Sequence, residues 1–370
     1  MKRVPALLAG RTIRGPESAR IWIDEEPYIN FVGCNYLALQ TLDELRSAGR
    51  FAVELDHPWS QMRSGAHGGC DPVFEELAKE GAIYFGTETS VFLPTGYFCG
   101  LAAVAGLYSH FDVVFIDELA HFSLSDAARL SGCPVVPFPH ANATALHDML
   151  RVNLNGGQRP LVLTDGIFAT TGRLPPLADY FQSVSEFGGL LFVDESHAYG
   201  VVGSNGRGAA EYCNVTEAWH AGTLSKGFCA HGGLLPCSNE FAAHVRSLPP
   251  VRGASAGSPV SALVAAAAMR YAGTQPKRRE HLYTVSQQLK TGLRGLGLDI
   301  VDTPAPITAF TVGKNANMVA LQRSLFDDGF HVALSSYIGS GPEGMIRCAT
   351  FADHSKSDIE ALLRTLGQRL

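Results

Sequence analysis

Short apolar runs, each followed by a turn of small residues and then by a helical pattern, recur between about residues 90 and 240. Runs without polar interruption are typical of strands that are buried on both faces, and such strands form parallel sheets covered by helices. The alternation therefore predicts one open α/β region from about residue 50 to 250, with a mostly parallel sheet. The runs are SVFLPTG (90–96), VVFIDE (113–118), PVVPF (134–138), PLVLTDGIF (160–168), LLFVDESH (190–197) and GGLLPCS (232–238).

The pattern changes near SLPPVRGASAGSP (247–259), where prolines and glycines replace the apolar runs. An alanine-rich helix is predicted next, and then a smaller α+β section that closes with a strand and a helix. We therefore expect a large α/β domain over 51–255 and a small α+β domain over 256–370. We expect the first 50 residues to pack with the small domain. A chain of 370 residues is long enough for two domains.

The composition argues against several classes of partner. Hydrophobic residues make up 46% of the chain and charged residues 17%, which allows a large buried core. The net charge of −6 and the pI near 6.1 argue against nucleic acid or an anionic membrane as the main partner. No run approaches the roughly 18 apolar residues of a membrane span, and the apolar patch in MKRVPALLAGRTIRG is too short for a secretory signal.

The eight cysteines are scattered and form no C-x-x-C pair, which favours reduced thiols in a cytoplasmic protein over a disulfide framework. A metal site is not expected. The sequence has no H-E-x-x-H motif, and the HGGC segment (67–70) lacks a second pair of ligands.

Polar residues gather where the predicted strands end. Ligands of open α/β sheets bind beyond the carboxyl ends of the strands, so one site assembled from several strand ends is expected. These residues are Thr95 and Gly96, Asp117 to His121, Asp165 and Gly166, and Asp194 to His197.

Two of these strand ends have a specific chemistry. A carboxylate at a buried strand end is costly unless a cation or a strong donor meets it, so Asp194 indicates either a binding site or a helix cap. The turn LPTGYFCG (93–100) leads from a strand into a helix, whose free amides suit a phosphate group. Taken alone, that turn is explained equally well as an ordinary strand-to-helix connection.

Lys226, in GTLSKGF (222–228), has no charged neighbour and follows Thr223 and Ser225. A lysine in a partly dry pocket of small residues loses its proton readily and becomes a nucleophile for aldehydes. Together with Asp194 and the phosphate-binding turn, it suits a pyridoxal phosphate cofactor. In this arrangement the lysine forms the Schiff base and the aspartate pairs with the pyridinium nitrogen. His121, in DELAHFS (117–123), could stack on the ring.

Seven segments, in order along almost the whole chain, resemble those of the α-oxoamine synthase family of pyridoxal phosphate enzymes. The resemblance implies the fold type I architecture, with a large, mostly parallel, seven-stranded sheet and a smaller α+β domain built from both termini. The segments are NYLAL (35–39), TGYFCG (95–100), DELAHFSLSDAARLS (117–131), DGIFATTGRLPPL (165–177), VDESHAYGVVGSNGRG (193–208), GTLSKGF (222–228) and IRCATFADHSKSDIEAL (346–362).

The resemblance also implies roles for single residues. Lys226 holds the cofactor and later moves the Cα proton of the substrate. Asp194 pairs with the ring nitrogen, His197 hydrogen-bonds the ring 3′-oxygen, and His121 stacks on the ring. Asn35 and Arg347 approach the substrate, and the planar guanidinium suits an amino-acid carboxylate. Gly96 and Tyr97 offer backbone amides to the phosphate and Thr223 offers a hydroxyl, and the predicted cofactor-binding set also includes Thr95 and Ser225.

Two segments depart from the family pattern. Ala169 stands where the family has a serine, so a hydroxyl near the cofactor and the substrate is missing. The loop HPWSQMRSGAHGGCDPV (57–73) lacks the family's G-S-R triplet, and Cys70 or Asp71 replaces the histidine that precedes the next helix. The cofactor side of the site is therefore expected to be intact and the substrate side to be rebuilt.

The resemblance implies the condensation of an amino acid with an acyl thioester of coenzyme A or of a carrier, with decarboxylation, to an α-amino ketone. The rebuilt segments keep an aminotransferase on the same scaffold as the alternative. An inactive regulatory subunit is a lesser alternative, because Lys226 is present. The segment GASAG (253–257) fits the G-x-S-x-G elbow of hydrolases around Ser255, but SLPPVR before it has no strand pattern. Relatives with this fold are homodimers, so a homodimer is expected.

Overall fold

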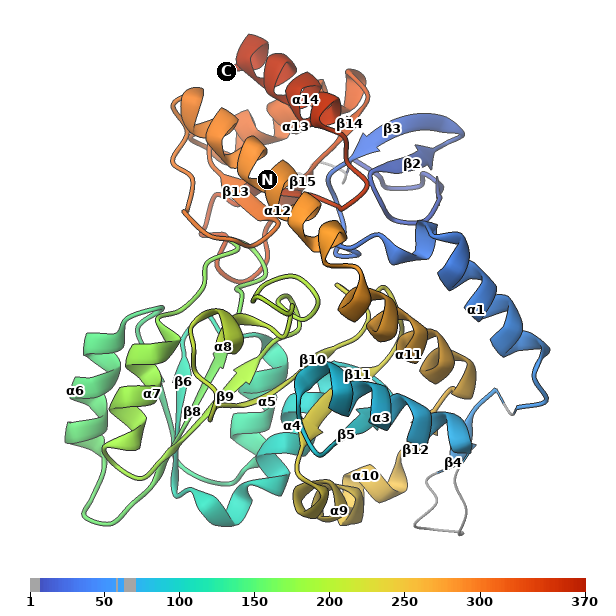
Figure 1. Cartoon of the computed structure of the whole chain (residues 1–370). Helices are drawn as coiled ribbons and strands as arrows, with labels where there is room; N and C mark the ends of the chain where they lie inside the picture. Colours follow the sequence, from blue (N-terminus) through green and yellow to red (C-terminus); the bar gives the residue numbers. More distant parts are fainter. Residues whose placement is uncertain (1–6, 58, 63–70) are drawn as a thin grey trace.

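The central element of the structure, a computed structural model that describes residues 7–57, 59–62 and 71–370, is a seven-stranded sheet (Figure 1). Its strand order is β5-β11-β10-β9-β8-β6-β7. Strands β10, β9, β8, β6 and β7 are parallel, whereas β11 is antiparallel to both of its neighbours. The prediction of a large, mostly parallel sheet is confirmed. The strands are β5 (Thr89–Leu93), β6 (Val113–Asp117), β7 (Val135–Phe138), β8 (Pro160–Asp165), β9 (Leu190–Asp194), β10 (Trp219–Thr223) and β11 (Gly233–Cys237).

Helices cover both faces of this sheet, which explains why its inner strands are apolar throughout. Every residue of β6, β8 and β11 is buried. Side chains of one strand point alternately to two separate cores, so Val114 and Phe115 belong to different clusters. One face packs against α4 (Tyr97–Gly106), α5 (Phe122–Leu130) and α9 (Asn239–Ser247). The other face packs against α3 (Pro72–Phe85), α6 (Ala143–Asn153), α7 (Leu177–Ser185) and α11 (Pro259–Thr274).

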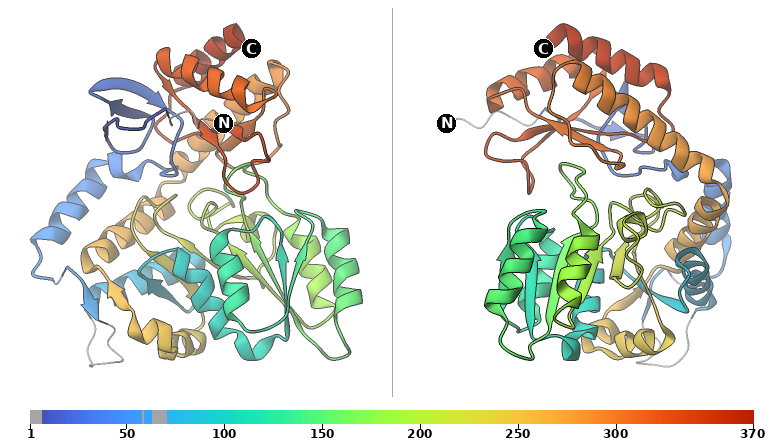
Figure 2. Two further views of the ribbon diagram at one scale, coloured as in Figure 1. Left: turned by 180° about the vertical axis from the view of Figure 1, so that it is seen from behind. Right: turned by 60° about the vertical axis from the view of Figure 1, so that its left-hand side comes forward.

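A second, smaller sheet stands beyond the carboxyl ends of the parallel strands (Figure 2). It has the order β13 (Ile307–Phe310), β16 (Met345–Ala349), β15 (Ala333–Ser335) and is antiparallel. Three helices share its core, α12 (Pro276–Gly295), α13 (Asn315–Asp327) and α14 (Lys356–Arg369). The last helix begins with a capping box between Ser355 and Asp358, which satisfies two backbone amides at its start.

The N-terminal strands join the C-terminal part of the chain. They are β1 (Ile13–Arg14), β2 (Arg20–Ile23) and β3 (Glu26–Asn30), and β3 pairs in parallel with β14 (Phe330–His331). Helix α1 (Asp43–Glu54) packs against α11, which also packs against α3. The domain boundaries at residues 50 and 255 stay a prediction.

The hydrolase alternative fails on local structure. Ser255 begins the short strand β12 (Ser255–Gly257), which pairs with β4 (Gln61–Met62), and the short helix α10 (Pro249–Gly253) precedes it. A nucleophile elbow needs a buried strand before the serine and a helix starting at it, and neither is present at Ser255. Within the described ranges, no helix combines the length and the apolar character that a membrane crossing requires.

Candidate active site

A cavity of about 330 Å³ lies at the carboxyl ends of the parallel strands, between the two sheets. Four of the residues that the sequence predicts for the site, Lys226, His121, His197 and Arg347, line this cavity. The large sheet and the small sheet both contribute to it, because Ser335 and Arg347 come from β15 and β16. The lining residues are Cys34, His121, Ala169, Thr170, His197, Lys226, Ser335, Tyr337 and Arg347.

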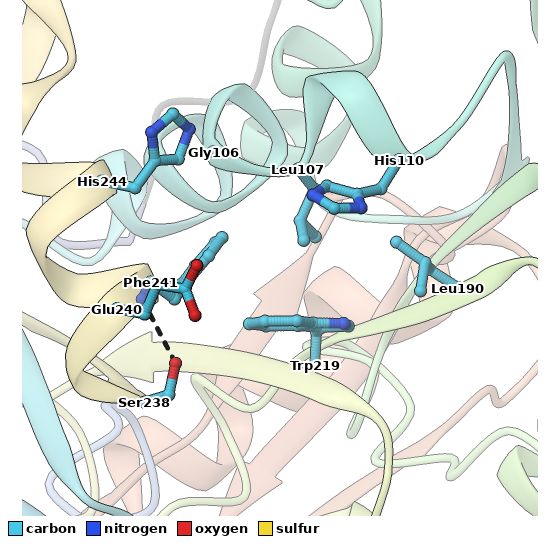
Figure 3. A pocket seen from close by; sticks show the side chains of 9 residues that line it. All are labelled: Gly106, Leu107, His110, Leu190, Trp219, Ser238, Glu240, Phe241 and His244. Carbon is cyan, nitrogen blue, oxygen red and sulfur yellow. Dashed lines mark hydrogen bonds between the residues drawn. The ribbon is translucent and has the colours of Figure 1, made fainter.

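A separate cavity of about 270 Å³ lies at the opposite edge of the sheet (Figure 3). Leu190 and Trp219, which line it, are the first residues of β9 and β10. None of the predicted site residues lines this cavity. Since ligands of open α/β sheets bind at the carboxyl ends of strands, the cavity around Lys226 is the candidate active site.

Two carboxyl groups lie side by side at the strand ends. Asp194, the last residue of β9, is buried and accepts hydrogen bonds from the Ser196 amide at 2.9 Å and the Ser123 hydroxyl at 3.5 Å. Asp165 is its register partner on β8 and accepts from the His121 amide at 2.8 Å. Burial, and then the neighbouring Asp194, raise the pKa of Asp165 well above its usual value, which favours the protonated form of this carboxyl group.

Lys226 lies in the loop between β10 and β11, and its side chain is half-buried. Its ammonium group forms no hydrogen bond or ion pair with any residue that the structure describes. The loop is held against the sheet at Gly227, where a Cβ would lie 2.1 Å from the carbonyl oxygen of Tyr199. The amine is therefore positioned at the cavity by the backbone and is available to a ligand.

His197 is fixed by a hydrogen bond between its Nδ1 and the hydroxyl of Tyr36, at 2.7 Å. Burial, followed by the charges of Lys226 and Arg347, lowers the pKa of His197 well below its usual value, so the ring is neutral. The Tyr36 hydroxyl also interacts with the side chains of Arg347 and Cys34. With the hydroxyl proton directed to Nδ1, the neutral ring carries its own proton on Nε2, on the other side of the imidazole.

His121 caps the start of α5, where its Nδ1 accepts from the Ser123 amide and lies 2.7 Å from the Ser123 hydroxyl. Its pKa is lowered, mainly by burial. The ring centres of Tyr97 and Tyr337 lie 6.0 Å and 6.2 Å from that of His121. Aromatic side chains therefore surround the face of the cavity where a flat ligand could stack.

The predicted phosphate-binding residues come together at the start of α4. A Cβ at Gly96 would lie 2.3 Å from the Cβ of Thr223, so only glycine allows this helix end to meet the 223–225 loop. The Thr223 hydroxyl lies 2.7 Å from the Ser225 hydroxyl, and the Thr95 hydroxyl accepts from the Tyr97 amide at 3.2 Å. A helix N-terminus with adjacent hydroxyls fits a phosphate group.

Of the two residues predicted to approach the substrate, Arg347 lines the cavity and Asn35 does not. Arg347 donates from Nε to the Ala169 carbonyl at 2.8 Å and reaches the cavity. Asn35 is half-buried and does not line the cavity, although Cys34 beside it does. Thr170, after the predicted departure at Ala169, donates its hydroxyl to the Ile338 carbonyl at 2.7 Å.

The structure describes only part of the 57–73 loop, the second segment that departs from the family pattern. Asp71 caps helix α3 by accepting from the Val73 amide, and its carboxylate lies 2.7 Å from Nδ1 of His57. Residues 58 and 63–70, which include Cys70, lie outside the described residues.

Sequence reasoning missed several residues at the site. Cys34 and Tyr36 flank the predicted Asn35, so the sequence carried a signal for these two, whereas Asp165 was already expected among the strand-end residues. Ser335 and Tyr337 carried none, because they reach the cavity from the small sheet.

The comparisons with known proteins agree with this architecture. The chain is 29% identical to the 8-amino-7-oxononanoate synthase of Geotalea daltonii, over 95% of this chain and 90% of that protein. It is also 29% identical to the enzyme of the same name from Methylococcus capsulatus, over 96% and 92% of the two chains. The structure superposes on serine palmitoyltransferase of Sphingomonas wittichii with a TM-score of 0.90, at 24% identity and over 98% and 92% of the chains.

Two further solved structures share the fold. The S. paucimobilis serine palmitoyltransferase with bound PLP and myriocin gives a TM-score of 0.88 at 22% identity, over 97% and 92% of the chains. The 8-amino-7-oxononanoate synthase of Francisella tularensis gives 0.76 at 20% identity, over 92% and 97%. The predicted fold type I architecture and the resemblance to the α-oxoamine synthases are confirmed. Because the family model "Aminotransferase class I and II" matches residues 35–366, nearly the whole chain, the protein belongs to that family.

Proposed function

We propose that the protein is a pyridoxal phosphate-dependent acyltransferase that condenses an amino acid with an acyl thioester, releases carbon dioxide and yields an α-amino ketone. One observation carries the proposal: the amine of Lys226, which has no hydrogen-bond or ion-pair partner among the described residues, and the guanidinium of Arg347 line one cavity at the strand ends. The relatives named 8-amino-7-oxononanoate synthase, which match over more than nine tenths of this chain, support it.

The residues around the cavity fit pyridoxal phosphate. Lys226 would hold the cofactor covalently, and the buried Asp194 carboxylate would accept a hydrogen bond from the protonated ring nitrogen. The Nε2–H of His197 would donate to the ring oxygen, and His121 would cover one ring face. The phosphate would bind at Gly96, beside the hydroxyls of the 223–225 loop. When bound, pyridoxal phosphate supplies an electron-withdrawing ring that stabilises negative charge at the substrate Cα.

The other steps depend on side chains of this chain. The guanidinium of Arg347 binds the substrate carboxylate, and its bond to the Ala169 carbonyl fixes its direction. Lys226, once released as an amine, takes the Cα proton at Nζ, and its place in the cavity brings this base to the substrate. Tyr36 keeps His197 in one tautomer, so that the same ring nitrogen always donates.

An aminotransferase activity is the second candidate. Ala169 lines the cavity without the hydroxyl that the synthases have there, which favours altered chemistry on the substrate side. The two activities differ in their co-substrate and product. The purified holoenzyme should release free thiol and carbon dioxide from an amino acid and an acyl thioester. Transfer of the amino group to an added keto acid, with no thiol released, would contradict the acyltransferase proposal.

The Lys226→Ala variant tests the role of the lysine. The variant lacks the amine, so covalent attachment of the cofactor and proton transfer at Cα are both lost. We therefore expect kcat to fall by about 10²- to 10⁴-fold or more. The absorption band of the cofactor bound to the wild type should shift in the variant. An unchanged spectrum and an inactive wild type would instead favour the regulatory-subunit alternative.

The same proposal includes a homodimeric, cytoplasmic enzyme whose acyl donor is a thioester of coenzyme A or of a carrier protein. The resemblance to the α-oxoamine synthases supports these three points. Light scattering of the purified protein at several concentrations tests the dimer, because a mass near that of one 39.6 kDa chain would exclude it.

A further inference from the structure

A third cavity, of about 450 Å³, lies where α11 ends and α12 begins, beside the C-terminal end of α3 and the loop that follows His197. It shares no lining residue with the active-site cavity. Its lining residues are Glu80, Ile83, Tyr84, Ser204, Asn205, Arg207, Met269, Arg270, Gly273, Thr274, Pro276 and Arg279.

The charges on this cavity do not balance. Of its three arginines, Arg270 is neutralised by Glu76 and Glu80, at 3.0 Å and 2.7 Å. Arg207 and Arg279 form no ion pair with any residue in the described part of the chain. Each makes one side-chain hydrogen bond to a backbone carbonyl instead: Arg207 Nε to Tyr84 at 2.7 Å, and Arg279 Nη2 to Ser204 at 2.7 Å. Two half-buried guanidinium groups therefore face one cavity without an ion-pair partner of their own, although the Glu211 carboxylate accepts from the backbone amide of Arg207 at 3.0 Å.

The backbone makes room for both guanidinium groups at glycines with left-handed conformation. A Cβ at Gly86, where φ is +72°, would lie 3.1 Å from Nη1 of Arg207. A Cβ at Gly206, where φ is +77°, would lie 2.8 Å from Nη1 of Arg279. Two separate turns thus hold the two guanidinium groups beside the same cavity, with both terminal nitrogens of Arg207 free to donate.

We propose that this cavity binds a small molecule that carries two or more phosphoryl groups. Guanidinium forks match phosphoryl oxygens in pairs, and a doubly charged anion would neutralise both free arginines. The Thr274 hydroxyl donates to backbone carbonyls of its own helix and the Asn205 amide donates to Glu211 at 2.7 Å, so the two arginines are the groups proposed to hold the anion. Ile83, which is 64% exposed, and Pro276 form an apolar wall on which the organic part of a nucleoside diphosphate could pack.

Calorimetric titration of the holoenzyme with inorganic pyrophosphate and with ADP, at low ionic strength, tests the proposal. The bound cofactor blocks the phosphate-binding turn at Gly96, so that the titration reports on other sites. We expect saturable binding of one anion per chain. Tighter binding of ADP would indicate that the apolar wall holds the nucleoside, and equal binding would indicate that the phosphoryl groups alone are recognised.

Variants locate the site. Arg279→Gln should weaken pyrophosphate binding by about tenfold or more, because it removes one charged fork. Arg151→Gln makes the same change of charge on the exposed face of α6, away from the cavity, and should bind like the wild type. Binding that Arg279→Gln leaves unchanged, or no binding at millimolar pyrophosphate, would overturn the proposal.

A second pair of variants keeps the test decisive if Arg279→Gln does not fold. A Cβ at Gly273 would lie 3.5 Å from the Tyr84 ring, an ordinary contact, so a side chain fits there. Gly273→Glu adds a carboxylate at the cavity, and Gly273→Gln adds a neutral side chain of the same size. The glutamate variant should bind pyrophosphate at least about tenfold more weakly than the glutamine variant. Equal affinities of the two variants would contradict the assignment.

Discussion

Two buried tyrosine hydroxyls lie against histidine Nδ1 atoms. Tyr36 meets His197 at 2.7 Å beside the active-site cavity, and Tyr199 meets His220 at 2.6 Å, where neither residue lines that cavity. Both tyrosines are fully buried. The two pairs share the same tyrosine–imidazole bond and differ in whether the imidazole faces the cavity, but Tyr36 also interacts with Arg347, so Tyr199 is a control for the tyrosine–imidazole bond alone.

We predict that Tyr36→Phe and Tyr199→Phe each lower the free energy of unfolding by about 1–2 kcal/mol, because each removes a buried hydrogen bond. Tyr36→Phe should also reduce kcat/KM by roughly tenfold, since the His197 ring is no longer held in one tautomer. Urea unfolding and steady-state kinetics measure the two effects. Equal losses of kcat/KM in both variants would show that the Tyr36 hydroxyl has a structural role alone.

Among single residues, the sequence indicated as site residues those whose chemistry is unusual for their surroundings. Lys226 among small residues and Asp194 at a strand end were both indicated by local pattern. Tyr36 was indicated only by its place beside Asn35, because its partner is 161 positions away in the chain and its residue type alone does not distinguish it from a core tyrosine. Residues that act through a distant partner can be identified only once the fold is known.

Among the helices, α12 carries a buried lysine without a carboxylate partner. Lys290 is fully buried, donates to the Thr303 carbonyl at 2.7 Å and also bonds the Ala305 carbonyl. Thr303 in turn donates to the Gly172 carbonyl at 2.7 Å, in the segment that follows β8. The lysine thus secures a loop that joins the small sheet to the large one. Burial lowers the pKa of Lys290 to about 7 from its usual 10.5.

We predict that Lys290 makes the protein more stable as the pH rises from about 7 toward 10.5. In this interval the unfolded chain holds the lysine proton and the folded protein does not, so the free energy of unfolding increases with pH by up to about 1.4 kcal/mol per unit. Other groups titrate there as well, and the comparison with Lys290→Met isolates the effect. The wild type should gain stability relative to this variant between pH 7.5 and 9.5, whereas Lys277→Met, at an exposed position, should follow the wild type. Parallel curves for all three proteins would contradict the prediction.

The elements themselves were predicted unevenly. The strands of the large sheet stand out in the sequence because helices cover both of their faces, as in β8, whose six residues are all buried. The final strand β16 and helix α14 were also predicted. The short strands β1 and β15 were not, since β1 is exposed and β15 is half-buried, and neither has an apolar run. Pairing across the chain, as between β3 and β14, creates such strands, and periodicity does not reveal it.

In the whole molecule, the active-site cavity is closed by parts of the chain that are far apart in sequence. The strand ends of the large sheet supply the residues expected to hold the cofactor, and β15 and β16 supply the opposite wall. Cofactor-side residues were predictable because they follow apolar strands. The opposite wall was not, except for Arg347 through the family resemblance, because its position depends on how the two sheets are placed.

The interior also contains three histidines that burial keeps neutral, His220, His331 and His354, each with its pKa lowered to about 4. They lie in different parts of the molecule: His220 on β10, His331 on β14 and His354 before α14. The unfolded chain binds a proton at each near pH 6.5, so these groups remove stability as the pH falls from 6.5 to 4. Two buried acids act in the opposite direction, because burial raises the pKa of Glu195 to about 8 and also raises that of Asp165.

We predict a net loss of stability in acid, because these three histidines and His197, whose pKa burial also lowers, outnumber the two buried acids. The acids also stop compensating as the pH approaches their unfolded values near 4. His220→Gln tests one histidine, since the amide oxygen can still accept from Tyr199 but does not titrate. Urea unfolding at pH 7, 6, 5 and 4.5 should show that this variant loses less stability than the wild type, by up to about 1.4 kcal/mol per pH unit. His244→Gln, at an exposed position, should follow the wild-type curve. If His220→Gln also follows it, the ring of His220 is protonated in the folded protein at the same pH as in the unfolded chain, and its burial does not govern acid stability.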